Sequence, residues 1–79
     1  MKSFKPVSNI TFSAQIYNQI YDAIISGTYQ TGEKLPSEKD VCTMFRVSRS
    51  PVRVALSTLE RNGFVNAVQG AGNFVGQLH

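Results

Sequence analysis

Apolar residues recur at every fourth position early in the chain, a spacing that places them on one face of an α-helix. The stripe consists of Phe12, Ile16, Ile20 and Ile24, with Ala23 beside it. Gly27 follows and suits the left-handed conformation in which many helices end. We therefore predict a first helix over residues 11–26, with Tyr17 and Tyr21 packed at the edge of its apolar face.

A turn and a short extended stretch are predicted for residues 28–36, because Pro36 biases the residue before it away from the helical conformation. A second helix is predicted to begin after Ser37, which is a good N-cap, and Asp40 follows at the spacing of a capping box. We expect the apolar residues of this helix to face inward: Val41, Met44 and Phe45.

A short link at residues 46–47 leads to a third predicted helix over residues 48–62. Ser48 is its expected N-cap, and Pro51 falls in the first turn, where a missing N–H costs little. The apolar positions recur at i, i+3, i+4 and i+7: Val52, Ala55, Leu56 and Leu59. The opposite face carries Ser50, Arg53 and Ser57.

After Gly63 the apolar period shortens, and residues 64–68 and 74–75 are predicted to form two strands joined by a glycine-rich hairpin turn at residues 69–73. Two helices joined by a tight turn form a helix-turn-helix unit, and the hairpin after it is a wing. The fold class is therefore α+β and mostly helical: a winged helix-turn-helix of three helices with a two- to three-stranded β wing.

The composition excludes several classes of function. A chain of 79 residues forms one small domain with little room for a walled catalytic pocket. One cysteine, Cys42, and one histidine, His79, make neither an internal disulfide nor a four-ligand zinc site. The sequence offers no nucleophile–base set, so we expect no enzyme and no cofactor. With no apolar run of ~18 residues and no secretory signal, we expect a cytoplasmic protein without a membrane partner.

The net charge of +3 is only mildly basic, but the charges are unevenly distributed. Residues 41–59 contain no acid and carry Arg46, Arg49 and Arg53. This asymmetry indicates a surface that faces an anion. Surface arginines and serine caps also occur without any binding role, so the prediction depends on the combination of features rather than on one of them.

A helix that reads the major groove of DNA needs a polar, basic N-terminal turn. Arg49 and Arg53 lie one turn apart at that position, and an arginine can donate two parallel hydrogen bonds to guanine. The hydroxyls of Ser48 and Ser50 suit phosphate oxygens, and Lys39 of the second helix is in a position to reach the DNA backbone.

The hairpin turn has a composition that suits close approach to DNA. Gly70 and Gly72 have no side chain, so the backbone there can approach a sugar–phosphate edge or enter a minor groove. Gln69 can hydrogen-bond to a base edge or a phosphate. The same residues also suit an ordinary exposed turn.

Taken together, these motifs resemble the GntR family of bacterial transcription regulators over residues 12–75. The resemblance is carried by Leu35–Lys39, Val47–Leu56 and Gly70–Val75, with Leu59 and Gly63 between them. It implies that DNA is contacted by Lys39, Arg49, Ser50, Pro51 and Arg53, and by Gln69 and Gly70 at the wing tip. The chain departs from the family pattern at several positions. Val54 replaces a frequent glutamate, so an acid that orients Arg53 is expected to be missing. Ala71 and Asn73 replace a wing arginine and threonine, and Lys39 stands where the family usually has arginine.

The resemblance also implies a homodimer on pseudo-palindromic double-stranded operator DNA, and we predict a ligand-responsive repressor. Residues 1–10 are expected to be a flexible N-terminal arm, 11–76 the DNA-binding domain, and 77–79 the start of a linker to a C-terminal domain, absent from the chain, that binds a small-molecule effector. The main alternative is a winged helix that binds protein and no DNA. An RNA-binding winged helix ranks lower, because aromatic residues placed for base stacking are lacking.

Overall fold

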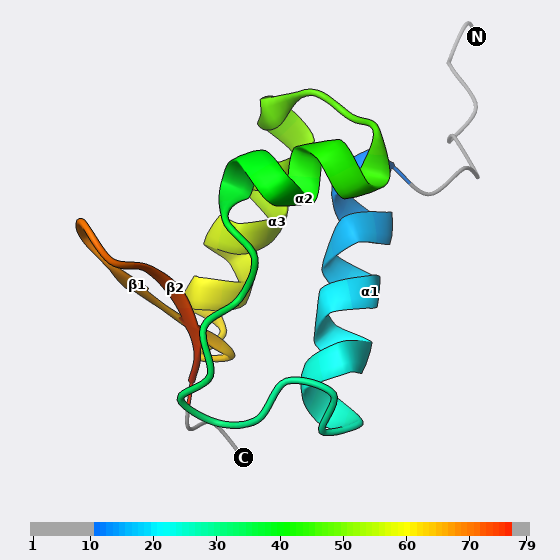
Figure 1. Cartoon of the computed structure of the whole chain (residues 1–79). Helices are drawn as coiled ribbons and strands as arrows, with labels where there is room; N and C mark the ends of the chain where they lie inside the picture. The colour runs from blue at the N-terminus through cyan, green and yellow to red at the C-terminus, as the bar shows by residue number, and fades with distance from the viewer. Residues whose placement is uncertain (1–10, 77–79) are drawn as a thin grey trace, which may run out of the picture.

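The computed structural model describes residues 11–76, which form three helices followed by a β-hairpin (Figure 1). The elements are α1 (Phe12–Ile25), α2 (Glu38–Phe45), α3 (Arg49–Arg61), β1 (Val65–Val68) and β2 (Gly72–Val75). This order confirms the predicted winged helix-turn-helix. The N-terminal arm and linker expected at residues 1–10 and 77–79 lie outside the described residues. None of the helices described here has the length and apolar character needed to span a membrane.

Side-chain caps fix the start of the first two helices. The Thr11 hydroxyl accepts a hydrogen bond from the Ala14 N–H at 3.2 Å, and the Ser37 hydroxyl accepts one from the Asp40 N–H at 3.1 Å. Each cap satisfies one of the N–H groups that a helix start leaves without a partner. Ser48 is the N-cap of α3 as predicted, but its hydroxyl makes no capping hydrogen bond.

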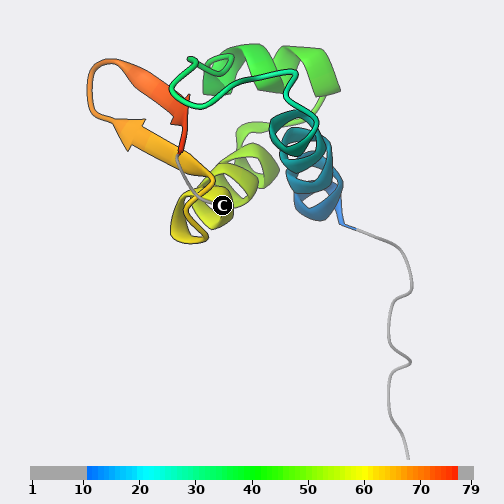
Figure 2. The same cartoon turned by 90° about the horizontal axis from the view of Figure 1, so that it is seen from below.

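The core lies where the three helices meet the base of the wing. All four residues of the predicted α3 stripe are buried there, and Leu59 and Val52 have no exposed surface. The full set of buried residues is Ile16, Leu35, Val41, Val52, Ala55, Leu56, Leu59, Val65 and Val75. In both views the wing and α1 lie on opposite sides of α3, so α3 is the central element (Figures 1 and 2).

Two residues predicted to face inward are exposed instead. Phe12 is 64% exposed because it is the first residue of α1, one turn before Ile16, where burial begins. Met44 is 59% exposed because the short α2 buries Val41 and packs Phe45 against the core, while Met44 lies at the edge of that narrow stripe. Periodicity identifies the apolar face correctly in both helices but overestimates how much of it is covered.

The tyrosines of α1 pack at the edge of the core, as predicted. The rings of Tyr17 and Tyr21 stack with their centroids 6.1 Å apart, and Tyr21 meets Phe64 edge-on at 5.0 Å. The Asn62 side-chain amide donates a hydrogen bond to the Tyr17 hydroxyl at 2.9 Å. These contacts join α1 to the end of α3 and help to fix the orientation of α3.

The wing is an antiparallel pair in which Val65 lies opposite Val75 and Val68 opposite Gly72. β2 begins at Gly72, two residues earlier than predicted, because Gly72 and Asn73 join the ladder instead of the turn. Residues 33–35 run along the other edge of β2: the Leu35 N–H donates to the Asn73 carbonyl at 2.8 Å, and the Val75 N–H donates to the Glu33 carbonyl at 2.9 Å. The two named strands are therefore extended by a short third segment, within the predicted range.

Candidate nucleic-acid interface

The first turn of α3 presents polar and basic side chains to solvent. Ser48, Arg49, Ser50 and Arg53 are all exposed, and Pro51 is half-buried in the first turn. The side chains of Arg49 and Arg53 each retain 64% of their accessible surface. Because the apolar stripe of α3 holds the helix against the core, its N-terminus is left free at one end of the molecule (Figure 1).

Glu38, the first residue of α2, holds both arginines. The Arg53 Nε lies 3.2 Å from each of the two carboxylate oxygens of Glu38, and the Arg49 Nε lies 3.8 Å from one of them. The expectation that Arg53 lacks an orienting acid because of Val54 is therefore wrong. The acid comes from the neighbouring helix, 15 residues earlier in the chain. An arginine fixed in this way loses fewer rotamers when it binds a base.

Sequence reasoning missed this role of Glu38. The residue follows the α2 N-cap, where an acid is favoured by the helix dipole alone, and that explanation was sufficient for the sequence. The only available signal was the combination of an acid at the start of the second helix with arginines at the start of the third. Such a contact depends on how the two helices cross, which periodicity does not determine.

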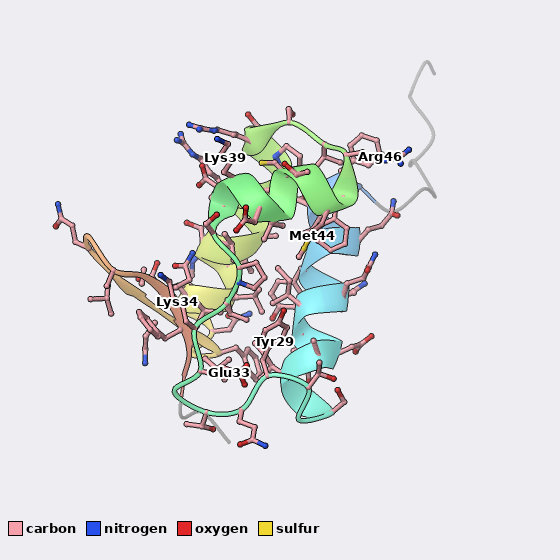
Figure 3. All side chains as sticks on the ribbon, viewed as in Figure 1. Tyr29, Glu33, Lys34, Lys39, Met44 and Arg46 are labelled. Atoms are coloured by element: carbon pink, nitrogen blue, oxygen red, sulfur yellow. The ribbon has the colours of Figure 1, made fainter. Side chains whose placement is uncertain are left out.

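Ser48 precedes Arg49 in the chain, and Lys39 follows Glu38, which contacts both arginines. Lys39 is exposed and directly follows Glu38, so it stands at the same end of α2 (Figure 3). The Ser48 hydroxyl is available because it makes no capping bond, and the first N–H groups of α3 have no side-chain cap from it. Such N–H groups and hydroxyls are suited to hydrogen-bond an anion. The structure thus brings Lys39, Ser48, Arg49, Ser50 and Arg53 to one region.

The predicted wing residues stand apart from that region. Gln69 and Gly70 are exposed in the turn between β1 and β2, which projects to one side of the helices (Figure 1). Gly70 has a φ of 80°, in the left-handed region, so the turn itself requires a glycine there. The hairpin separates these two residues from the start of α3, and the two groups form separate parts of the surface.

Lys34 is a basic residue near the wing that sequence reasoning did not single out. Its Cε lies 3.0 Å from the position that a β-carbon on Gly72 would occupy. Gly72 has a φ of 117°, and its lack of a side chain lets Lys34 cross the strand. Figure 3 shows Lys34 on the segment that runs between the wing and the helices. Across residues 11–76, Lys34 makes no ion pair with a carboxylate within 4.0 Å.

The family profile described as "Bacterial regulatory proteins, gntR family" matches residues 12–75. The chain is 39% identical over 62 residues to a probable fructoselysine utilization operon transcriptional repressor of Escherichia coli (strain K12), a match that covers 78% of this chain and 26% of that protein. It is 41% identical over 61 residues to an arabinose metabolism transcriptional repressor of Geobacillus stearothermophilus, covering 77% of this chain and 17% of that protein. The chain thus spans about a quarter or less of these relatives.

Solved structures agree with this match. The crystal structure of the AraR DNA-binding domain in complex with operator ORR3 superposes with a TM-score of 0.85 at 29% identity, covering 96% of this chain and 92% of that one. A GntR family transcriptional regulator from Listeria monocytogenes gives a TM-score of 0.84 at 26% identity, covering 91% of this chain and 63% of that one. The chain belongs to the GntR family of bacterial regulatory proteins.

Proposed function

We propose that residues 11–76 form the sequence-specific double-stranded DNA-binding domain of a bacterial transcription repressor. The observation that carries the proposal is the exposed start of α3, where Glu38 holds Arg49 and Arg53 side by side. The likeness to a DNA-binding domain solved with its operator supports the choice of partner. Because the partner is chromosomal DNA, the cytoplasm is the proposed compartment.

In this proposal the N-terminal turn of α3 enters the major groove. Arg49 and Arg53 donate hydrogen bonds to guanine O6 and N7, and each such pair contributes about 1–3 kcal/mol of discrimination against the wrong base. Glu38 keeps the two guanidinium groups close to their binding geometry before DNA arrives. Pro51 stiffens the same turn, because its ring fixes the backbone φ angle.

Lys39, Ser48 and Ser50 hold phosphates on either side of the inserted helix. Such contacts set the register of the protein on the duplex and carry no sequence information themselves. The wing contributes Gln69 and Gly70 at the adjacent minor groove, where the missing Gly70 side chain allows the backbone to approach closely. These contacts explain how a chain with a net charge of only +3 binds a polyanion.

Two copies bind a pseudo-palindromic operator as a homodimer, because a symmetric pair of domains reads symmetric half-sites. With about four to six phosphates neutralised per dimer, log affinity falls with log salt at a slope near −4 to −5. Response to a small-molecule effector belongs to a further domain in longer proteins of this kind.

A selection from a random duplex pool tests the proposal. The wild-type chain is expected to enrich a palindromic motif, and the Arg49→Ala, Arg53→Ala double variant is expected to enrich none. Far-UV circular dichroism of the variant provides the folding control. Equal enrichment by both proteins would contradict the assigned readout. If the chain prefers no duplex and instead binds a protein with an affinity that does not depend on salt, the alternative of a protein-binding winged helix is favoured.

A further inference from the structure

Arg46 has a positive backbone φ angle, which elsewhere in residues 11–76 occurs only at glycines. Its φ is 57° and its ψ is 48°, in the left-handed helical region. Within residues 11–76, the other positive φ angles belong to Gly27, Gly32, Gly63, Gly70 and Gly72. A side chain in this region brings its β-carbon close to the backbone carbonyl, so Arg46 is strained where glycine would not be.

The turn between α2 and α3 requires this conformation. The Val47 N–H donates to the Cys42 carbonyl at 3.1 Å, and the Arg46 N–H donates to the Thr43 carbonyl at 3.3 Å. These two hydrogen bonds form a Schellman motif, in which the position of Arg46 is usually glycine. The local backbone therefore accounts for the left-handed residue but not for the arginine.

The Arg46 side chain is exposed, and within residues 11–76 no carboxylate pairs with it. Among the described residues, the ion pairs within 4.0 Å join Glu38 to Arg49 and Arg53, and none involves Arg46. Its place in the fold is more informative. Residues 46–48 run along the same end of the molecule as the N-terminus of α3 (Figure 1), and Arg46 lies at the end of α2 opposite Lys39 (Figure 3).

The length of α2 matches the width of a DNA groove. Arg46 comes seven positions after Lys39, which corresponds to a rise of about 10 Å along the helix. The major groove of B-DNA is about 12 Å wide, and the helix before a recognition helix crosses the DNA backbone. With α3 in the groove, the two ends of α2 therefore approach the two phosphate strands that border it.

We propose that Arg46 is a phosphate contact on the DNA strand opposite the one held by Lys39, and that its positive charge is maintained at the expense of backbone strain. The inference rests on the proposed function. It adds to the predicted site a residue that positions α3 in the groove. Because it binds phosphate, Arg46 affects affinity for all duplexes and not the choice of bases.

Arg46→Gly tests this directly, because stability and DNA affinity are expected to change in opposite directions. Glycine relieves the left-handed strain, so the Tm rises by roughly 4 to 8 °C. Loss of the charge weakens binding to the selected duplex and to a scrambled duplex alike, by roughly three- to tenfold. The slope of log affinity against log salt becomes shallower by about 0.9 per protomer.

Two further variants complete the experiment. Arg46→Lys keeps the charge and is expected to retain most of the affinity and the salt slope. Arg61→Gln removes one exposed arginine from the far end of α3 and is expected to change both far less than Arg46→Gly does. Unchanged affinity and slope for Arg46→Gly, with a wild-type chain that binds duplex DNA, would overturn the inference alone. A wild-type chain that binds no duplex would overturn the proposed function and the inference with it.

Discussion

Replacement of Glu38 by glutamine is expected to separate the stability of the fold from the selectivity of the interface. The carboxylate accepts from Arg53 through both oxygens at 3.2 Å and lies 3.8 Å from Arg49. The arginine side chains are 64% exposed and that of Glu38 is 30% exposed, so solvent screens these pairs. Exposed pairs contribute about 0.2–1 kcal/mol, and the free energy of unfolding is expected to fall by less than about 1 kcal/mol.

The effect on DNA binding is larger and depends on sequence. Without the carboxylate the arginines sample more rotamers, and part of the discrimination of about 1–3 kcal/mol per arginine–guanine pair is lost. The ratio of affinities for the selected and the scrambled duplex is expected to fall roughly tenfold. Affinity for the scrambled duplex rises at the same time, because a negative charge next to the phosphates has been removed.

Fluorescence anisotropy titrations of the two duplexes, at several salt concentrations, measure this ratio. Asp40→Asn is the matched control, since it removes the same charge from the same turn of α2 without breaking a contact to an arginine. The control is expected to raise both affinities together and to leave their ratio unchanged. Identical behaviour of the two variants would show that Glu38 acts only through its charge, and would refute the positioning role.

Ser37→Ala is expected to lower the free energy of unfolding by about 1 kcal/mol in urea titrations, because it removes the α2 cap. Ser48→Ala is expected to leave stability nearly unchanged, since its hydroxyl makes no capping bond, while it weakens DNA binding; a stability loss as large as that of Ser37→Ala would contradict the structure. Leu59→Ala is expected to cost about 2–5 kcal/mol because Leu59 is fully buried, and a loss under about 1 kcal/mol in the same titrations would contradict that packing.

The fold could be predicted from sequence because its signals are local and agree with one another. The predicted α3 stripe of Val52, Ala55, Leu56 and Leu59 is buried throughout. The N-caps of α2 and α3 are Ser37 and Ser48, the residues predicted from their type and position. Local patterns specify which side of a helix is apolar. They do not specify how far the neighbouring element extends, so the exposure of Phe12 and Met44 could not be predicted from them.

The interface was harder to predict because its essential contacts join distant parts of the chain. The pairing of Glu38 with Arg53 requires α2 to cross the start of α3, a tertiary arrangement that no spacing rule contains. Lys34 lies beside Gly72 for the same kind of reason. The left-handed conformation of Arg46 could not be predicted, because the residue type that indicates such a helix end is glycine and this position is an arginine.

The central claim is that arginines at the start of α3 read guanines in the major groove. It is tested most directly with a selected operator in which each half-site guanine is replaced in turn by 7-deazaguanine, which lacks the N7 acceptor. The wild-type chain is expected to lose roughly tenfold in affinity at the contacted guanine, and the Arg53→Ala or Arg49→Ala variant to show no further loss at that position. Equal losses for wild type and both variants at every guanine would contradict the claim.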